Sequence, residues 1–233
     1  STALYLDVEA LASLNPQEVV RRVADASGGF SLPGWEPERL ADLRRLFEAY
    51  ASIDAEGLMD NLAYFLRAVV PVCEETGIRM AIHPDDPPWP IFGLPRIVTG
   101  PENLRRILDM VDSPANGLTL CSGSLGSNPA NDMPAIAREF SARGRVPFAH
   151  VRNIRFTGGG SFAESAHLSR EGSLDLYEIM RAYHETGFDG YIRPDHGRMI
   201  WDEKGRPGYG LHDRALGIAY LEGIWEALEK GSR

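Results

Sequence analysis

Cysteine, long apolar runs and an excess of positive charge are all scarce in this sequence of 233 residues. Two cysteines allow one disulfide at most, which excludes a small scaffold built on disulfides. No run approaches the roughly 18 consecutive apolar residues of a membrane span, and the N-terminus lacks the pattern of a signal peptide. A formal charge of -9 argues against a nucleic-acid surface, which normally carries a basic stripe. We therefore expect a cytoplasmic protein with reduced thiols that binds neither nucleic acid nor membranes.

The chain does contain enough apolar residues for a globular core, since they make up 43% of it. Residues 1–77 have the pattern of a helical region. Asn15 is a cap for the first helix, and Pro37 begins the second. A third helix is predicted over residues 54–75, with Gly77 at the position of a left-handed C-terminal cap.

From residue 78 onward, short apolar strands alternate with amphipathic helices, which is typical of βα units in a parallel sheet. The strands are predicted at residues 78–83, 118–121, 146–151 and 190–193, and the helices at 101–111, 134–143, 173–186 and 213–229. Each strand leads into a long polar loop rich in Gly and Pro, as in barrels whose active site lies at the C-terminal face.

These patterns predict an α/β fold of the TIM (β/α)8-barrel type in one structural domain. Residues 78–233 provide about the C-terminal four βα units, and residues 1–77 provide the helical region before the fifth strand. The chain begins at Ser1 without a methionine, so we expect the other barrel strands to be missing from it. A self-contained open sheet is the alternative.

Each predicted strand ends in or near a residue that can bind a metal. The carboxyl ends of parallel barrel strands surround one mouth, so side chains far apart in sequence can converge there. One such residue would more often be a core histidine, a small buried cysteine or a turn aspartate. Imidazole, thiolate and carboxylate together suit zinc, iron(II) or cobalt, with manganese less expected. The candidate ligands are His83, Cys121, His150 and Asp195.

The segments around these residues resemble the mannonate dehydratase family of hexuronate degradation. They read AIHPDDPPWPIFGLPRIV, LTLCSGSLGSNP, FAHVRNI, FAESAHLSREGSLDLYEIM and GYIRPDHGRMIW, in the same order and spacing as in that family. The resemblance implies a TIM barrel without its first four strands and a lyase that converts D-mannonate to 2-keto-3-deoxy-D-gluconate. It implies Mn²⁺ or Fe²⁺ as the cofactor, without excluding Co²⁺ or Zn²⁺. It also places the four strand-end residues on the family's metal-ligand positions.

His196 and Tyr209 fall on positions that the resemblance associates with acid–base catalysis. Dehydration of a sugar acid removes the C2 proton and expels the C3 hydroxyl, so it requires a base, an acid and a cation for the developing charge. An imidazole is the readier base near neutral pH and a phenol the readier proton donor. We therefore assign the base to His196 and the acid to Tyr209, and the reverse assignment stays open.

Several residues near these groups are candidates for binding the substrate. An arginine can hold a carboxylate by two parallel hydrogen bonds, an asparagine can recognise a hydroxyl, and a loop histidine can reach substrate when the loop closes. The candidates are Arg152, Asn153, Arg193, Arg198 and His167.

Two other kinds of function fit the same residues. A metal-dependent sugar isomerase or epimerase of TIM-barrel type would use similar proton abstraction. A non-catalytic fragment would use its Cys and His residues to bind a structural metal. The leading prediction is a dehydratase that acts on a small sugar acid and forms a homo-oligomer.

Overall fold

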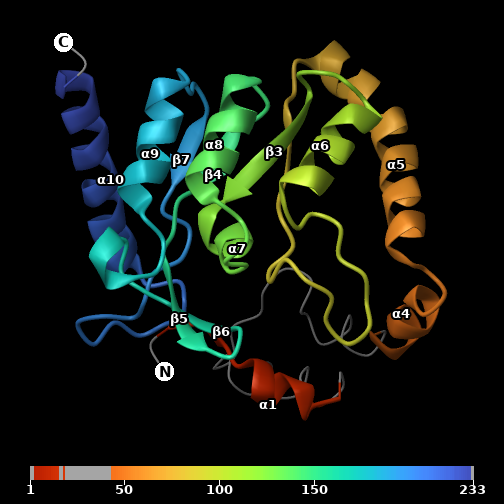
Figure 1. The fold of residues 1–233 in the computed structure, drawn as a ribbon, viewed down its shortest axis with the longest axis horizontal. Coiled ribbons are helices and arrows are strands. Elements are labelled where there is room, and N and C mark those ends of the chain that lie inside the picture. The colour runs from red at the N-terminus through yellow and green to blue at the C-terminus, as the bar shows by residue number, and fades with distance from the viewer. Residues whose placement is uncertain (1–2, 16–17, 19–42, 232–233) are drawn as a thin grey trace.

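A computed structural model describes residues 3–15, 18 and 43–231, and its centre is a parallel sheet (Figure 1). The strand order is β2-β3-β4-β7. The strands are β2 (Met80–Ile82), β3 (Asn116–Cys121), β4 (Phe148–His150) and β7 (Tyr191–Arg193). They confirm the four strands predicted from residue 78 onward, with bounds that differ by a few residues. The register pairs Cys121 with His150 and His150 with Arg193, so the carboxyl ends of three neighbouring strands are level.

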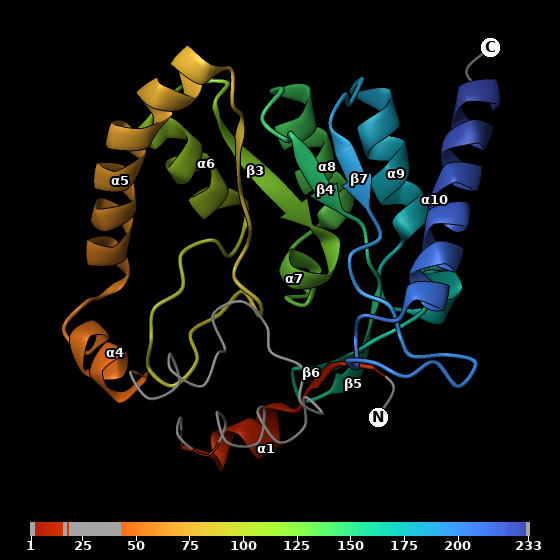
Figure 2. The same ribbon diagram turned by 180° about the vertical axis from the view of Figure 1, so that it is seen from behind.

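Helices cover one face of this sheet. Figures 1 and 2 show α6, α8 and α9 on that face, with α5 beyond the β2 edge and α10 beyond the β7 edge. Prolines and aspartates start them, since Pro101 opens α6 and the carboxylates of Asp132 and Asp175 accept backbone N–H groups of α8 and α9. The helices are α5 (Ala55–Thr76), α6 (Pro101–Met110), α8 (Met133–Ala142), α9 (Leu176–Glu185) and α10 (Leu211–Gly231).

The hydrophobic core lies between the sheet and these helices. Strand side chains such as Leu118 and Leu120 have no exposed surface, and Leu104 of α6 and Phe140 of α8 pack in the same cluster. Burial of this apolar surface is what holds the sheet and the helices together. The fold is therefore of the α/β class with a parallel sheet, as the alternating pattern predicts.

The region predicted to be helical contains α5, as expected, and also a strand. Asp54 caps α5, and Gly77 ends it with a φ of 69°, which confirms the helix predicted over residues 54–75. Two shorter helices, α1 (Val8–Ala12) and α4 (Leu43–Tyr50), also belong to this region. The helix predicted after Asn15 and the start of the one predicted at Pro37 lie outside the described residues.

The strand is β1 (Tyr5–Leu6), and it pairs antiparallel with β6 (Ser161–Glu164). β6 pairs in turn with β5 (Ile154–Gly158), which makes a second sheet of order β1-β6-β5. A helical region over residues 1–77 is therefore only partly right. Local patterns cannot indicate β1, because its partner lies more than 150 positions away along the chain.

Two short helices complete the description, α7 (Ser122–Gly126) after β3 and the 3-10 helix η1 (Ser169–Glu171) before α9. Within the described part of the chain, no helix combines the length and the apolar character required to cross a membrane.

Candidate metal centre and active site

Three of the predicted metal ligands come together at the carboxyl ends of neighbouring strands. Cys121 and His150 are the last residues of β3 and β4, and His83 directly follows β2. One ligand atom from each of these residues lies within 4.8 Å of the other two. Cys121 and His150 are buried, whereas His83 is exposed. The parallel order of the strands therefore produces the convergence that the strand-end positions predict.

Asp195, the fourth predicted ligand, borders this group from β7. Its Oδ1 lies 3.3 Å from His150 Nδ1, and its Oδ2 lies 3.8 Å from Cys121 Sγ. The residue has a φ of 61°, in the left-handed region that aspartate tolerates better than most residues. The chain thus turns sharply after β7 and directs a buried carboxylate to the other three side chains.

The charges of this cluster support one another. Burial by itself would raise the pKa of the Cys121 thiol, but Arg152, His150 and His83 lower it to about 5. Burial would likewise lower the pKa of His150, and the neighbouring Asp195 and Cys121 instead raise it to about 9. The pKa of Asp195 is held well below its usual range, against its burial, by His150, His196 and Arg152. The cluster therefore favours a thiolate and a carboxylate, the forms that bind metal ions.

The donor set fits a divalent metal ion. Both ring nitrogens of His150 are buried, and neither makes a hydrogen bond of normal geometry within the described structure, although Asp195 Oδ1 lies 3.3 Å from Nδ1. A buried polar atom without a partner is costly unless a ligand satisfies it. Because a thiolate, a carboxylate and a second imidazole surround this ring, a metal ion would meet ligands that borderline-soft divalent cations accept. The His/Cys/His group with Asp195 is therefore a candidate metal centre.

Arg152 lies behind the candidate metal centre and is 2% exposed. Its Nε lies 3.5 Å from Cys121 Sγ and 3.3 Å from Asp195 Oδ2. Gly123 of α7 makes room for it, because a side chain there would overlap the guanidinium. The side chains that surround the guanidinium are Asp86, Cys121, Ser124, Glu164, Asp195 and His196.

His196 and Tyr209, the predicted acid–base pair, lie side by side. Their ring centroids are 5.2 Å apart at an interplanar angle of 54°. A parallel bridge between Gly197 and Tyr209 joins the two loop segments that carry them. His196 Nε2 lies 3.7 Å from Asp195 Oδ2, so this pair adjoins the candidate metal centre.

Two of the predicted substrate-binding residues have contacts that brace the fold. Asn153 has no exposed surface, and its amide bonds to the backbone of Leu168 and Leu174. His167 is 2% exposed, and its Nε2 lies 2.7 Å from the carbonyl of Pro194. Both residues are buried in these contacts, and their role in binding a substrate stays a prediction.

Arg198 and Arg193, two of the predicted substrate-binding arginines, differ in how many hydrogen bonds they make to neighbouring carboxylates. Arg198 donates its backbone N–H, Nε and Nη2 to the buried carboxylate of Asp213. Arg193 has a side chain that is 41% exposed and lies 3.4 Å from Asp195 Oδ1. Arg193 therefore combines closeness to the candidate metal centre with access to solvent.

Two acidic residues of this site are absent from the sequence-based candidates for substrate or metal binding. Glu164 accepts from Arg152 and its Oε1 lies 2.6 Å from His196 Nδ1, and Asp86 Oδ2 lies 2.5 Å from Arg152 Nη2. Glu164 ends a strand in the segment predicted as a loop, and Asp86 lies in a Pro-rich turn. Both residues lie within segments that carry the family resemblance, FAESAH and HPDDPP, but a carboxylate in a turn has many local uses, so the sequence gives no clear signal for them.

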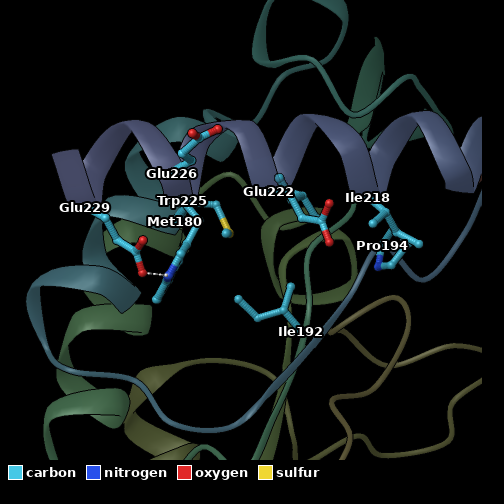
Figure 3. Close-up of a pocket in the computed structure, with 9 residues that line it drawn as sticks. Met180, Ile192, Pro194, Ile218, Glu222, Trp225, Glu226 and Glu229 are labelled. Atoms are coloured by element: carbon cyan, nitrogen blue, oxygen red, sulfur yellow. Dashed lines mark hydrogen bonds between the residues drawn. The ribbon is translucent and has the colours of Figure 1, made fainter. Parts of the chain in front are cut away.

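A separate groove lies between α10, α9 and β7 (Figure 3). Its volume is about 320 Å³, and Met180, Ile192 and Ile218 give it an apolar lining. Trp225 Nε1 donates to Glu229 Oε1 at its rim. None of the candidate metal ligands lines it, so it is distinct from the candidate metal centre.

The parallel sheet and the cluster at its carboxyl ends define an α/β protein with a candidate metal centre. The family model of D-mannonate dehydratase (UxuA) matches residues 1–233, and the chain belongs to this family. It is 60% identical over 221 residues to a mannonate dehydratase of Lactococcus lactis subsp. cremoris (strain MG1363), covering 94% of this chain and 62% of the relative. It is 58% identical over 233 residues to that of Geobacillus thermodenitrificans (strain NG80-2), covering 100% of this chain and 63% of the relative.

A solved structure is similar as well, the crystal structure of mannonate dehydratase from Streptococcus suis serotype2. The TM-score is 0.78 at 44% sequence identity, and the match covers 82% of this chain and 54% of that chain. This chain therefore spans less than two thirds of the length of these relatives.

Proposed function

We propose that this chain carries the metal-binding and acid–base residues of a lyase that converts D-mannonate to 2-keto-3-deoxy-D-gluconate and water. Membership of the D-mannonate dehydratase family supports this proposal. The observation that carries it is the convergence of the His83, Cys121 and His150 ligand atoms beside the pair His196 and Tyr209. Metal ligands and an acid–base pair within one site are what the elimination of water from a sugar acid requires.

We infer that His83, Cys121, His150 and Asp195 hold the divalent ion, with Mn²⁺ or Fe²⁺ as the expected metal. When bound, such an ion stabilises the negative charge that develops beside the substrate carboxylate after C2 loses its proton. The thiolate and carboxylate are available for binding, since neighbouring groups lower the pKa values of Cys121 and Asp195.

His196 and Tyr209 share the proton transfers in this proposal. His196 accepts the C2 proton at Nε2, the ring nitrogen on the side of Asp195. Tyr209 donates its phenolic proton to the departing C3 hydroxyl, because hydroxide is a poor leaving group. Among the five predicted substrate-binding residues, Arg193 is best placed to hold the substrate carboxylate, because it is partly exposed and close to Asp195.

We further propose that the four parallel strands form part of a TIM (β/α)8 barrel. The arrangement of helices on one face of the sheet supports this, as does the similar fold of a longer mannonate dehydratase. The division at residue 77 within one structural domain, a cytoplasmic location and a homo-oligomeric state all stay predictions.

Product analysis tests the proposed reaction. The full chain would be incubated with D-mannonate and Mn²⁺ or Fe²⁺, and the products identified by NMR. Formation of a 2-keto-3-deoxy acid supports the lyase. An isomer or epimer of mannonate would instead support the alternative enzyme class, and folded, metal-loaded protein that forms no product would contradict both.

Tyr209→Phe tests the acid role within the same assay. The variant is expected to lower kcat by about 10²–10⁴-fold, because one proton-transfer group is removed. Its metal content by elemental analysis should equal that of the unmodified protein, since Tyr209 is not among the proposed ligands. An unchanged rate would exclude Tyr209 as the acid or the base.

A further inference from the structure

A buried carboxylate holds the imidazole of His196 on the side away from the candidate metal centre. Glu164 Oε1 lies 2.6 Å from His196 Nδ1. The other ring nitrogen, Nε2, lies 3.7 Å from Asp195 Oδ2. The side chain of Glu164 is 5% exposed, and a hydrogen bond is strengthened where water is excluded.

Two neighbours of Nδ1 favour opposite tautomers of His196. An ionised carboxylate only accepts hydrogen bonds, so Glu164 requires a proton on Nδ1. A guanidinium only donates, so Arg152, whose Nη1 lies 3.0 Å from the same nitrogen, favours an unprotonated Nδ1.

The shorter contact decides between them. At 2.6 Å, an unprotonated Nδ1 would set its lone pair against those of the Glu164 oxygen, which is strongly repulsive. Arg152 Nη1 has another acceptor, because it also donates to Glu164 Oε1. When Nδ1 carries the proton, the guanidinium therefore still has Glu164 as an acceptor. If Nδ1 did not carry the proton, the carboxylate of Glu164 would lose the hydrogen bond from His196.

We propose that Glu164 is a positioning residue that fixes His196 as the Nδ1–H tautomer, so that the Nε2 lone pair faces the candidate metal centre. The tautomer itself depends only on the contacts of this chain. Its use in catalysis rests on the proposed function, since a neutral imidazole with a free Nε2 can accept the C2 proton of mannonate.

The second sheet explains how Glu164 is held in place. Glu164 ends β6, the middle strand of the β1-β6-β5 sheet. Its backbone N–H donates to the carbonyl of Leu4 at 2.9 Å, and it pairs in register with the fully buried Ile154 of β5. The antiparallel sheet that sequence patterns miss thus fixes the carboxylate that orients His196.

Nitrogen-15 NMR of the histidine rings tests the proposal in the full chain, since the two tautomers have distinct shifts for Nδ1 and Nε2. The chain has six histidines, and the signals of His196 are identified by their loss in His196→Gln. Unmodified protein is expected to carry the proton on Nδ1. Glu164→Gln should keep this tautomer, because the amide oxygen can accept from Nδ1–H, whereas Glu164→Ala should shift it towards Nε2–H.

Asp86→Asn is the matched control. It removes a carboxylate from the same guanidinium, since Asp86 Oδ2 lies 2.5 Å from Arg152 Nη2, but the described contacts of Asp86 do not include His196. The tautomer of His196 should therefore be unchanged in Asp86→Asn. A change in this control equal to that in Glu164→Ala would show that the charge of Arg152, and not Glu164, sets the tautomer.

Kinetics give a second readout on mannonate. Glu164→Ala should lower kcat by about 10–100-fold, the range typical of groups that orient residues around a metal site, with KM little changed. A proton on Nε2 in the unmodified protein overturns the proposal, as does a wild-type spectrum in Glu164→Ala. If Glu164→Ala does not fold, the tautomer of His196 measured in the unmodified protein and in Glu164→Gln tests the proposal. An Nδ1–H tautomer in a protein that does not dehydrate mannonate would contradict the proposed function and leave the positioning role intact.

Discussion

Two buried arginines lie at opposite ends of β4, and their surroundings differ in kind. Arg145, before the strand, is 7% exposed, and Arg152, after it, is 2% exposed. Arg145 donates mainly to backbone carbonyls, with Nε on Asn116 and Nη2 on Leu108. Its one carboxylate partner, Asp112, is on the surface, with a side chain that is 83% exposed.

Arg152 instead contacts side chains that can change their charge or bind a ligand, including Cys121, Asp195 and His196. At the end of the sheet around Arg145, the guanidinium bonds mostly to backbone carbonyls, including those at the C-terminal end of α6, an arrangement that serves stability. The end around Arg152 concentrates ionisable groups in a buried place at a cost in stability, an arrangement that serves function. Changes at the two ends should therefore have different consequences.

Replacing Arg152 should have the largest effect. Arg152→Met removes the guanidinium that pairs with the buried carboxylates of Glu164 and Asp195, so we expect a loss of about 3–5 kcal/mol in the free energy of unfolding. Metal retention and dehydration of mannonate should fall together, because Cys121 loses the guanidinium that, with His150 and His83, lowers the pKa of its thiol. Urea unfolding and elemental analysis measure these effects. A variant that is as stable and as metal-rich as the unmodified protein would refute the contrast between the two ends.

Added metal ions should stabilise the protein by binding at the end of β4 that carries Arg152, and not at the end that carries Arg145. At a metal concentration of 100 times Kd, binding to the folded state alone raises the free energy of unfolding by about 2.7 kcal/mol. Cys121→Ser should lose most of this gain, because a hydroxyl is a poor substitute for a thiolate ligand. Thermal unfolding with and without Mn²⁺ measures it, and Cys73→Ser is the matched control on α5. An equal gain in Cys121→Ser and the unmodified protein would remove Cys121 from the ligand set.

Replacing Arg145 should cost stability without affecting the site. Arg145→Met removes donors from the carbonyls of Asn116, Leu108 and Val111, with an expected loss of about 2–3 kcal/mol. The exposed Asp112 is hydrated after the change, so no charge is left buried. Metal content and kcat measured well below the unfolding temperature should equal those of the unmodified protein. A selective loss of metal would show that the two ends are coupled.

The smallest effect is expected at Asp213, which tests a structural ion pair beside the site. Burial would raise the pKa of its carboxyl, but hydrogen bonds from Arg198 lower it below the ordinary value of about 3.9. The ion pair therefore stabilises the folded state fully at pH values above the ordinary pKa of the carboxyl. This stabilisation is lost as the pH falls through the lower pKa of the folded state. Asp213→Asn should lose about 1 kcal/mol at pH 7. The difference from the unmodified protein should shrink below pH 4, and a difference that grows there would contradict this sign.

Local sequence rules were sufficient for most of the parallel sheet and its helices. Apolar runs bounded by Gly and Pro indicated the four strands, and an apolar stripe followed by the C-terminal cap Gly77 indicated α5. β1 and the β5–β6 hairpin were missed, because strands of that kind are stabilised by partners and not by their own composition.

The candidate site divides in the same way. His83, Cys121, His150 and Asp195 could be named because the ends of parallel strands must meet at one edge of a sheet. For Asn153 and His167 the sequence is less informative, since a polar residue near the site has the same sequence signature whether it binds a substrate or braces a loop. That both side chains are buried among protein groups depends on the whole fold, which local patterns do not specify.

The sequence by itself determined which residue types stand at the strand ends, and hence the kind of chemistry, because secondary structure and strand direction follow largely from local patterns. Only the tertiary structure decided that Arg152 and Glu164 meet at His196, and which ring nitrogen is left free. Those contacts join separate strands and loops, and their strength comes from the exclusion of water, which no local pattern specifies.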